Sequence, residues 1–221
     1  MDSIKRSFFL IFSFVLFFNT ASAQSKDWEW IKTFGGKNAD GIYGSCLDKS
    51  ENLYIAGYFQ GEINIDGKQL KSKGDTDALI AKFDKNGNLC WAKQIGGEYA
   101  ENLIITEYTK DIKIDPSGNI VVAGVHSWGA TIDKTSLGGP GNTDIFIAKY
   151  TDGGDLIWVK SFGSFSHDYL FDMDLDDQNN IYFTGLFNGS IFSGEERVQE
   201  TGDIAGSTTC LIKLDLSGNL S

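Results

Sequence analysis

The sequence predicts an all-β protein built from about three copies of one four-stranded antiparallel unit. Three observations predict this fold class: a repeated phrase that begins at a tryptophan, short segments rich in β-branched and aromatic residues, and turn residues at fixed offsets between them. After the first 23 residues no segment shows a helical period of apolar residues. The 26 glycines and only 2 prolines among 221 residues fit tight turns and not a proline-rich linker.

Three tryptophans, each followed by a similar sequence, define the repeat. Trp30, Trp91 and Trp158 open the phrases WIKTFGG, WAKQIGG and WVKSFGS, and they lie 61 and 67 residues apart. Each copy then contains a segment such as IDPSGNIVVAG and, further on, one such as DALIAKFDKNGNL. Because the matching residues recur in the same order, we divide the chain into repeats at about 30–90, 91–157 and 158–221.

Each copy is expected to form four strands, which in the first copy cover residues 42–47, 53–59, 78–83 and 89–95. The turns between them begin with aspartate and end near glycine or asparagine, as in Asp84-Lys85-Asn86-Gly87-Asn88. The aspartate can accept backbone N–H groups, and glycine or asparagine tolerates a positive φ. The apolar runs LYIAGYF and ALIAKF lack strict alternation, which predicts strands covered on both faces of their sheet.

Four-stranded units of this length, with both faces covered, are typical of the blades of a β-propeller. The patterns W-x-K-x-[FI]-G-G, D-x-S-G-N-[IL]-[YV]-[IVF]-[AT]-G and D-[AI]-x-[IV]-A-K-[FY]-D-x-x-G-N-L-x-W resemble the bacterial seven-bladed β-propeller repeat family, often labelled SBBP, over residues 28–221. The third copy departs from the pattern at Ser164 and Thr208. The resemblance implies a secreted or surface-exposed bacterial protein, and most members of that family have no assigned activity.

The first 23 residues are predicted to be a secretory signal peptide. Lys5 and Arg6 precede an apolar run at 8–18, and Ala21-Ser22-Ala23 provides a small-residue cleavage site. Eleven residues are too few to cross a bilayer, which takes about 20. We therefore expect a mature protein of residues 24–221 that is secreted or held at the cell surface, with no membrane insertion after cleavage.

The number of repeats predicts an open or partial propeller, because closed propellers have about four to eight blades. Residues 28–34 would be a fourth strand with no blade before it, and the last repeat would lack its own fourth strand within residues 158–221. Open blade edges predict possible self-association, which light scattering would detect. The net charge of −11 argues against nucleic acid or an anionic membrane surface as partner, since both require a basic patch.

The predicted binding face is the rim that carries the blade-to-blade connections and the long unlike segments 60–76, 127–143 and 188–207. This rim also holds one acid ten residues after each tryptophan: Asp40, Glu101 and Asp168. These acids would either contact a ligand or cap backbone N–H groups. Trp128 lies in one of the unlike segments, where an exposed ring could stack on a sugar, although burial is the simpler expectation.

The other reactive residues carry weaker signals. The acidic run at 172–177 resembles a calcium loop, but its alternating acids would spread along a strand and its sixth position is not glycine. His126 and His167 occupy non-equivalent positions and are expected to be ordinary surface or strand-end residues, not a catalytic pair. Cys46, Cys90 and Cys210 are expected to be small buried residues, with a Cys46–Cys90 disulfide left open.

The sequence therefore predicts a non-catalytic binding or adhesion scaffold whose partner is an extracellular glycan or protein. No catalytic residue, metal ligand or cofactor is assigned. The alternative is a secreted glycan hydrolase or lyase with acids near the central channel, because paired carboxylates can cleave glycosidic bonds.

Overall fold

The structure is a computed structural model that describes residues 29–97, 107–194, 196–199 and 206–221. The predicted signal peptide and Glu101 lie outside these residues. The described chain folds into antiparallel sheets, none of which closes into a barrel, as expected for an open or partial propeller. It contains no helix long and apolar enough to cross a membrane.

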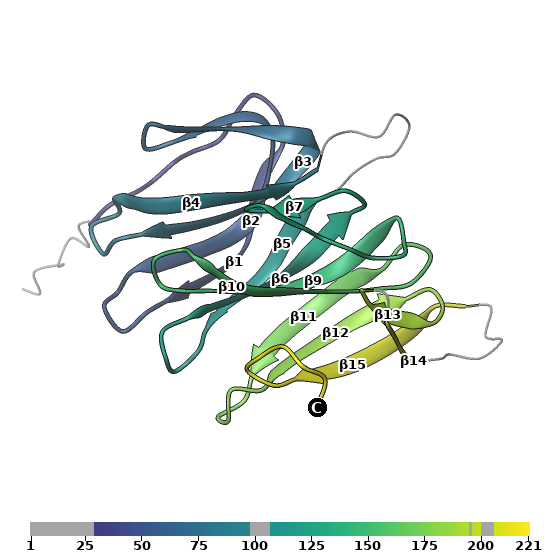
Figure 1. The fold of residues 1–221 in the computed structure, drawn as a ribbon. Coiled ribbons are helices and arrows are strands. Elements are labelled where there is room, and N and C mark those ends of the chain that lie inside the picture. Colours follow the sequence, from purple (N-terminus) through teal and green to yellow (C-terminus); the bar gives the residue numbers. More distant parts are fainter. Residues whose placement is uncertain (1–28, 98–106, 195, 200–205) are drawn as a thin grey trace, which may run out of the picture.

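Three blades follow one another along the chain (Figure 1). Blade one contains β1 (Asp40–Leu47), β2 (Leu53–Ile65), β3 (Lys68–Phe83) and β4 (Leu89–Gly96). Blade two contains β5 (Tyr108–Ile114), β6 (Ile120–Ser127), β9 (Thr143–Tyr150) and β10 (Leu156–Gly163). Blade three contains β11 (Tyr169–Leu175), β12 (Ile181–Phe187) and β15 (Thr208–Leu214). The predicted strands of the first copy all form, with β2 and β3 longer than expected.

Two small hairpins cross from one blade to the blade before it. The hairpin of β7 (Thr131–Ile132) and β8 (Thr135–Ser136) belongs to blade two but pairs with β4, and the hairpin of β13 (Ile191–Ser193) and β14 (Glu196–Gln199) belongs to blade three but pairs with β10. In blade one the corresponding residues prolong β2 and β3 and reach back to Gly35. The long unlike segments of the sequence therefore contain inter-blade hairpins, which satisfy backbone groups of the neighbouring blade's outer strand.

The hydrophobic core lies between the blades. Ile120 and Val122 of β6 pack in one cluster with blade one, whereas Val121, Ala123 and Val125 pack in a second cluster with blade three. Every residue of β6 is buried, because blade two has a neighbour on each face. In blade one, which contains the runs LYIAGYF and ALIAKF, the other face carries a third cluster, in which Ile55, Phe59 and Leu79 pack with Ile63, Ile65 and Phe34. The near-continuous apolar runs thus belong to strands that are covered on both faces, as predicted.

The repeated tryptophans dock each blade onto the next. The indole N–H groups of Trp30, Trp91 and Trp158 donate to backbone oxygens of Lys85, Asp152 and Leu216, at 3.1, 3.0 and 3.2 Å. Each ring also lies against the glycine of that same turn: Gly87, Gly154 or Gly218. Each of these glycines has a positive φ of 79° to 87°, so the turn needs glycine both for its backbone and for the close approach of the ring.

The two ends of the array expose strand edges. At the start, Phe34 stacks on Phe83 with ring centroids 6.0 Å apart, and Gly35 forms a single bridge to Asn64, so this segment lies against blade one. At the other end, Leu211 on β15 is 69% exposed. Within the described residues, no fourth strand pairs with β15 beyond the single bridge between Leu214 and Leu220.

Candidate functional site

One rim of the array is a uniform row of tight turns. In five of its six hairpins an aspartate accepts two backbone N–H groups and the side-chain amide of an asparagine four residues later; for Asp84 these hydrogen bonds are 2.9, 2.8 and 2.9 Å long. The same hydrogen bonds hold the turns at Asp48, Asp115, Asp176 and Asp215. This rim confirms the predicted turn chemistry, and its uniformity marks it as scaffold.

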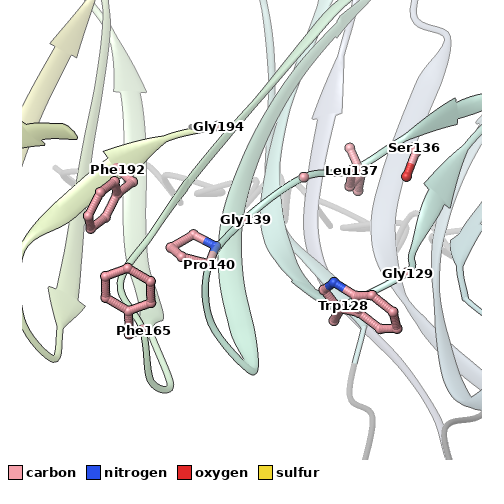
Figure 2. Close-up of a pocket in the computed structure, with 10 residues that line it drawn as sticks. Trp128, Gly129, Ser136, Leu137, Gly139, Pro140, Phe165, Phe192 and Gly194 are labelled. Atoms are coloured by element: carbon pink, nitrogen blue, oxygen red, sulfur yellow. The ribbon is translucent and has the colours of Figure 1, made fainter. Parts of the chain in front are cut away.

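The opposite rim is uneven and carries an open groove of about 530 Å³ at the junction of blades two and three. Figure 2 shows Trp128 at one end of the groove, Phe165 and Phe192 at the other, and Pro140 between them. The remaining lining residues are small or aliphatic: Gly129, Ser136, Leu137, Gly138, Gly139 and Gly194. Most ligand sites are concave and lined by aromatic and apolar side chains with a few polar groups, so this groove is the candidate site.

Trp128 is held outward by a rigid turn. It follows β6, and the turn is closed by the hydrogen bond from the Ala130 N–H to the Ser127 carbonyl, 3.2 Å long, with Gly129 at a φ of 82°. Ser127 and Ala130 on either side are buried, yet the Trp128 residue is 70% exposed. The expectation that Trp128 would be buried was wrong, because the tight turn points its side chain away from the core.

Phe165 is the second exposed ring of the groove. It lies in the connection between β10 and β11, is 71% exposed, and meets Phe192 edge-to-face with ring centroids 5.0 Å apart. Phe192 is positioned by β13, whose pairing places it opposite Gly163. Two blades and one inter-blade hairpin therefore fix this aromatic pair.

Asp168 holds the connection that presents Phe165. Its carboxylate accepts hydrogen bonds from the Ser164 N–H and hydroxyl, 2.5 and 2.6 Å, and from the Asn188 N–H, 3.2 Å. The side chain is fully buried beneath the groove and does not line it. Asp168 is therefore a capping residue that supports the site, which was one of the two roles expected for it.

A second buried acid, Asp144, faces Asp168 across the junction. Burial is the main cause that raises the pKa of Asp144 to about 7, and the charge of Asp168 adds to it. Burial also raises the pKa of Asp168. A Cβ on Gly163 or Gly139 would overlap the Asp144 carboxylate, so these glycines make room for the pair. Asp144 was not among the predicted site residues, although it begins the repeated segment DIFIAKY.

The junction between blades one and two contains a similar pair of acids, Asp77 and Glu107, which corresponds to Asp144 and Asp168 between blades two and three. Counting back eight residues from each first-turn aspartate gives Asp40, Glu107 and Asp168. Asp40 pairs with Phe59 in the register of β1 and β2, and Glu107 and Asp168 come directly before Tyr108 and Tyr169, the first paired residues of β5 and β11. Glu101, which was predicted as the equivalent acid, lies outside the described residues. The second copy has 16 residues from Trp91 to Glu107, whereas the other copies have ten from Trp30 to Asp40 and from Trp158 to Asp168. Both Asp77 and Glu107 are fully buried.

Asp40 does not approach the groove. Its carboxylate accepts a hydrogen bond from the Gly36 N–H, 2.7 Å, which is the same turn-capping contact that Asp168 makes with Ser164. The four residues that were predicted to bind a ligand therefore do not form one site. Trp128 lines the groove, Asp168 supports it from below, Asp40 caps a turn elsewhere, and Glu101 is outside the described residues.

The aromatic residues Trp128 and Phe192 occupy positions at which the other copies have no aromatic residue. The residues that occupy the Trp128 position in blades one and three are Gly61 and Gly189. Phe192 pairs with Gly163, the glycine five residues after Trp158. The equivalent glycines, Gly96 and Gly35, pair with Thr131 and Asn64, which are not aromatic. The fold therefore does not require aromatic residues at these positions, and the groove is special to one junction.

The remaining candidates do not form a site. His126 is buried, with its Nε2 2.7 Å from the Ser161 hydroxyl, and burial lowers its pKa to about 4; His167 lies apart in the loop before Asp168. All three cysteines are free thiols, so Cys46 and Cys90 form no disulfide. Cys90 is exposed, although it was expected to be buried. Asp172 and Asp174 are exposed on β11, and no group of three or more His, Cys, Asp or Glu in the described residues is placed to hold a metal ion.

Replacing Asp168 with alanine is expected to destabilise the protein by about 0.5–2 kcal/mol, because three buried donors would lose their acceptor. The melting temperature should fall by roughly 2–6 °C in a chain of this size. Asp172→Ala is the matched control, since Asp172 is exposed on the adjoining strand, and its effect should stay within about 0.5 kcal/mol. Equal melting temperatures for both variants would contradict the capping role.

Fold and groove together define a propeller-like repeat protein, and the comparison with known proteins agrees. A curated relative described as an uncharacterized WD repeat-containing protein, from Acanthamoeba polyphaga mimivirus, is 22% identical over 191 residues. WD repeats form four-stranded propeller blades. The match covers 72% of this chain but only 13% of the relative. No protein-family model matches the chain.

Proposed function

We propose that this chain is a non-catalytic recognition module of the propeller type, which binds an extracellular glycan or protein through the groove at the junction of blades two and three. The observation that carries the proposal is the pair of exposed rings, Trp128 and Phe165, each fixed on a rigid turn where the repeat does not require an aromatic residue. A contiguous exposed apolar patch on a protein surface often marks an interaction site.

The chemistry of the groove favours binding over catalysis. A glycan hydrolase needs two carboxyl groups about 5–10 Å apart on either side of the bond that it cleaves. The lining of the groove includes no acid, and the carboxyl pair of this junction, Asp144 and Asp168, is buried and does not line it. This arrangement supports a binding module in preference to the hydrolase or lyase alternative.

We further propose that the protein is exported by a bacterium and belongs with the SBBP repeat proteins. The basic, apolar and small-residue parts of residues 1–23 support export, and the three tryptophan phrases support the repeat family. N-terminal sequencing of the protein recovered from the producing cell should begin at or near Gln24. A cytoplasmic product that retains Met1 would contradict export.

An array of extracellular glycans and purified surface proteins tests the binding function. The full mature protein should bind a small set of ligands, and Trp128→Ala and Phe165→Ala should each weaken that binding at least tenfold, which corresponds to about 1.4 kcal/mol. Phe171→Ala is the control, because Phe171 is an exposed phenylalanine on β11 outside the groove. Ligand binding that survives both groove substitutions would show that the binding face lies elsewhere.

A further inference from the structure

We infer that the ligand of the groove is a neutral glycan, and that it spans two separate aromatic platforms, one at Trp128 and one at Phe165 with Phe192. This inference rests on the proposed binding function and narrows it to one ligand class. It is carried by three features of the groove: its lack of ionisable groups, the placement of its rings and the glycine backbone between them.

The lining of the groove is uncharged. None of its ten residues is Asp, Glu, Lys, Arg or His, although the chain as a whole has a net charge of −11. No Lys, Arg or His lines the groove, and Arg197, which pairs with Phe192 in the β13–β14 hairpin, lies outside this lining. The net charge of −11 disfavours an acidic polysaccharide. A basic peptide would find no carboxylate in the groove to pair with. The complementary ligand therefore carries no charge.

The rings offer flat apolar faces to such a ligand. The faces of Trp and Phe are electron-rich, and they attract the slightly positive C–H groups that a pyranose ring presents on its apolar side. Trp128 and Phe165 are both more than two-thirds exposed, so a sugar can reach them without a rearrangement of the protein. Because hydrogen bonds hold the turns that carry both rings, little backbone entropy is lost on binding.

The polar requirement of a sugar is met by backbone and one hydroxyl. Gly138 and Gly139 line the groove, and a Cβ added to Gly138 would meet no atom within 4 Å, so a ligand can approach the backbone closely at this residue. The exposed Ser136 contributes a hydroxyl. Such groups donate and accept hydrogen bonds without adding charge, as sugar hydroxyls require.

The separation of the platforms predicts a minimum ligand length. Figure 2 places Trp128 and the Phe165–Phe192 pair at opposite ends of the groove, with Pro140 between them. A single sugar ring can stack on one platform only, whereas an oligosaccharide can cover both. Affinity should therefore rise steeply from a monosaccharide to an oligosaccharide and then level off once both platforms are covered.

Titrations of the full mature protein with defined oligosaccharides test this inference. The probes are neutral series, namely gluco-, xylo- and manno-oligosaccharides of one to six units, with oligogalacturonate as the acidic probe and a polyproline peptide as the alternative ligand for an aromatic groove. Intrinsic fluorescence is a suitable readout, because Trp128 is the most exposed tryptophan among the described residues. Calorimetry provides a readout that does not depend on this residue.

We expect one neutral series to bind, with a hexasaccharide at least about tenfold tighter than its monosaccharide. Trp128→Ala and Phe165→Ala should each remove that length advantage and lower hexasaccharide affinity about tenfold or more, while Phe171→Ala leaves it unchanged. Circular dichroism melts of the variants exclude a folding defect as the cause.

Three results would overturn the inference. They are binding of the acidic oligosaccharide or of the polyproline peptide in preference to every neutral glycan, binding of monosaccharide and hexasaccharide with equal affinity, and absence of binding to every neutral series. The first leaves the proposed binding function intact if the preferred ligand still depends on Trp128. The proposed function itself fails only if no ligand of any class depends on the groove residues.

Discussion

Replacing Trp91 with alanine is expected to lower the melting temperature by roughly 5–15 °C. Trp91 packs on the turn glycine Gly154, donates its N–H to the Asp152 carbonyl at 3.0 Å and meets Tyr54 edge-on at 6.1 Å between ring centroids. Removing a largely buried tryptophan costs about 3–5 kcal/mol, and this half-buried one about 2–4 kcal/mol. Thermal unfolding followed by circular dichroism measures the change.

Two variants distinguish the contact of Trp91 with the next blade from the general effect of losing an aromatic ring. Trp91→Phe keeps most of the packing but removes the indole N–H that donates to the Asp152 carbonyl, so it should cost about 0.5–1.5 kcal/mol. Trp128→Ala removes an exposed indole that docks on no turn, and its effect on stability should remain within about 0.5 kcal/mol. If Trp91→Ala melted as Trp128→Ala does, the account of blade docking would be wrong.

Glu107→Gln is expected to stabilise the protein at alkaline pH and to have little effect at acidic pH. Glu107 is fully buried, and neither carboxylate oxygen accepts a well-formed hydrogen bond. Burial is the main cause that raises its pKa to about 8, the charges of Asp77 and Asp75 add to the increase, and the Ser127 amide offsets part of it. At neutral pH the folded protein therefore keeps this carboxyl protonated.

The sign of the pH dependence follows from the difference between the folded and unfolded states. An unfolded glutamate has a pKa near 4.5, so unfolding between pH 4.5 and 8 releases the proton, and stability falls as the pH rises through this range. Glutamine has the same shape and carries no proton to lose. The variant should therefore exceed the wild type by several degrees at pH 8, on the order of 2 kcal/mol, and match it near pH 5.

The comparison of variant with wild type at each pH removes the contributions of other groups. His126, whose pKa burial lowers to about 4, gives stability the opposite slope between pH 4 and 6.5, and it is present in both proteins. Glu62→Gln is the control, because Glu62 is exposed and pairs only at the surface with Lys71, 3.2 Å away. A melting difference for Glu107→Gln that did not grow from pH 5 to pH 8 would show that this carboxyl is ionised in the folded state.

Most of the scaffold could be predicted from sequence because local chemistry determines it. The turn aspartates act through hydrogen bonds to residues two and four positions away, so spacing alone identified them. A packing role for Trp91 and its equivalents was also predictable, since a large ring at the same position in every copy is expected to pack within or between the repeated units. The residue that each indole contacts lies in the next blade, however, and was found only in three dimensions.

The candidate site was harder to predict because it depends on exceptions to the repeat. The inter-blade hairpins differ in sequence from copy to copy, and their pairing with the preceding blade leaves no common local pattern. Glu107 was missed because counting began at the tryptophan, where the second copy is longer, and not at the turn aspartate. Trp128 was expected to be buried because its type usually is, whereas its exposure depends on the turn that Gly129 closes.

The most direct test of the account is the location of the bound ligand. Amide hydrogen exchange, measured with and without the tightest ligand from the arrays, should slow in residues 127–140 and 163–166, which build the two platforms. The turns at 48–52 and 115–119, on the opposite rim, should exchange as in the free protein. Ligand protection on that rim, with none around Trp128 and Phe165, would contradict the assignment of the binding face.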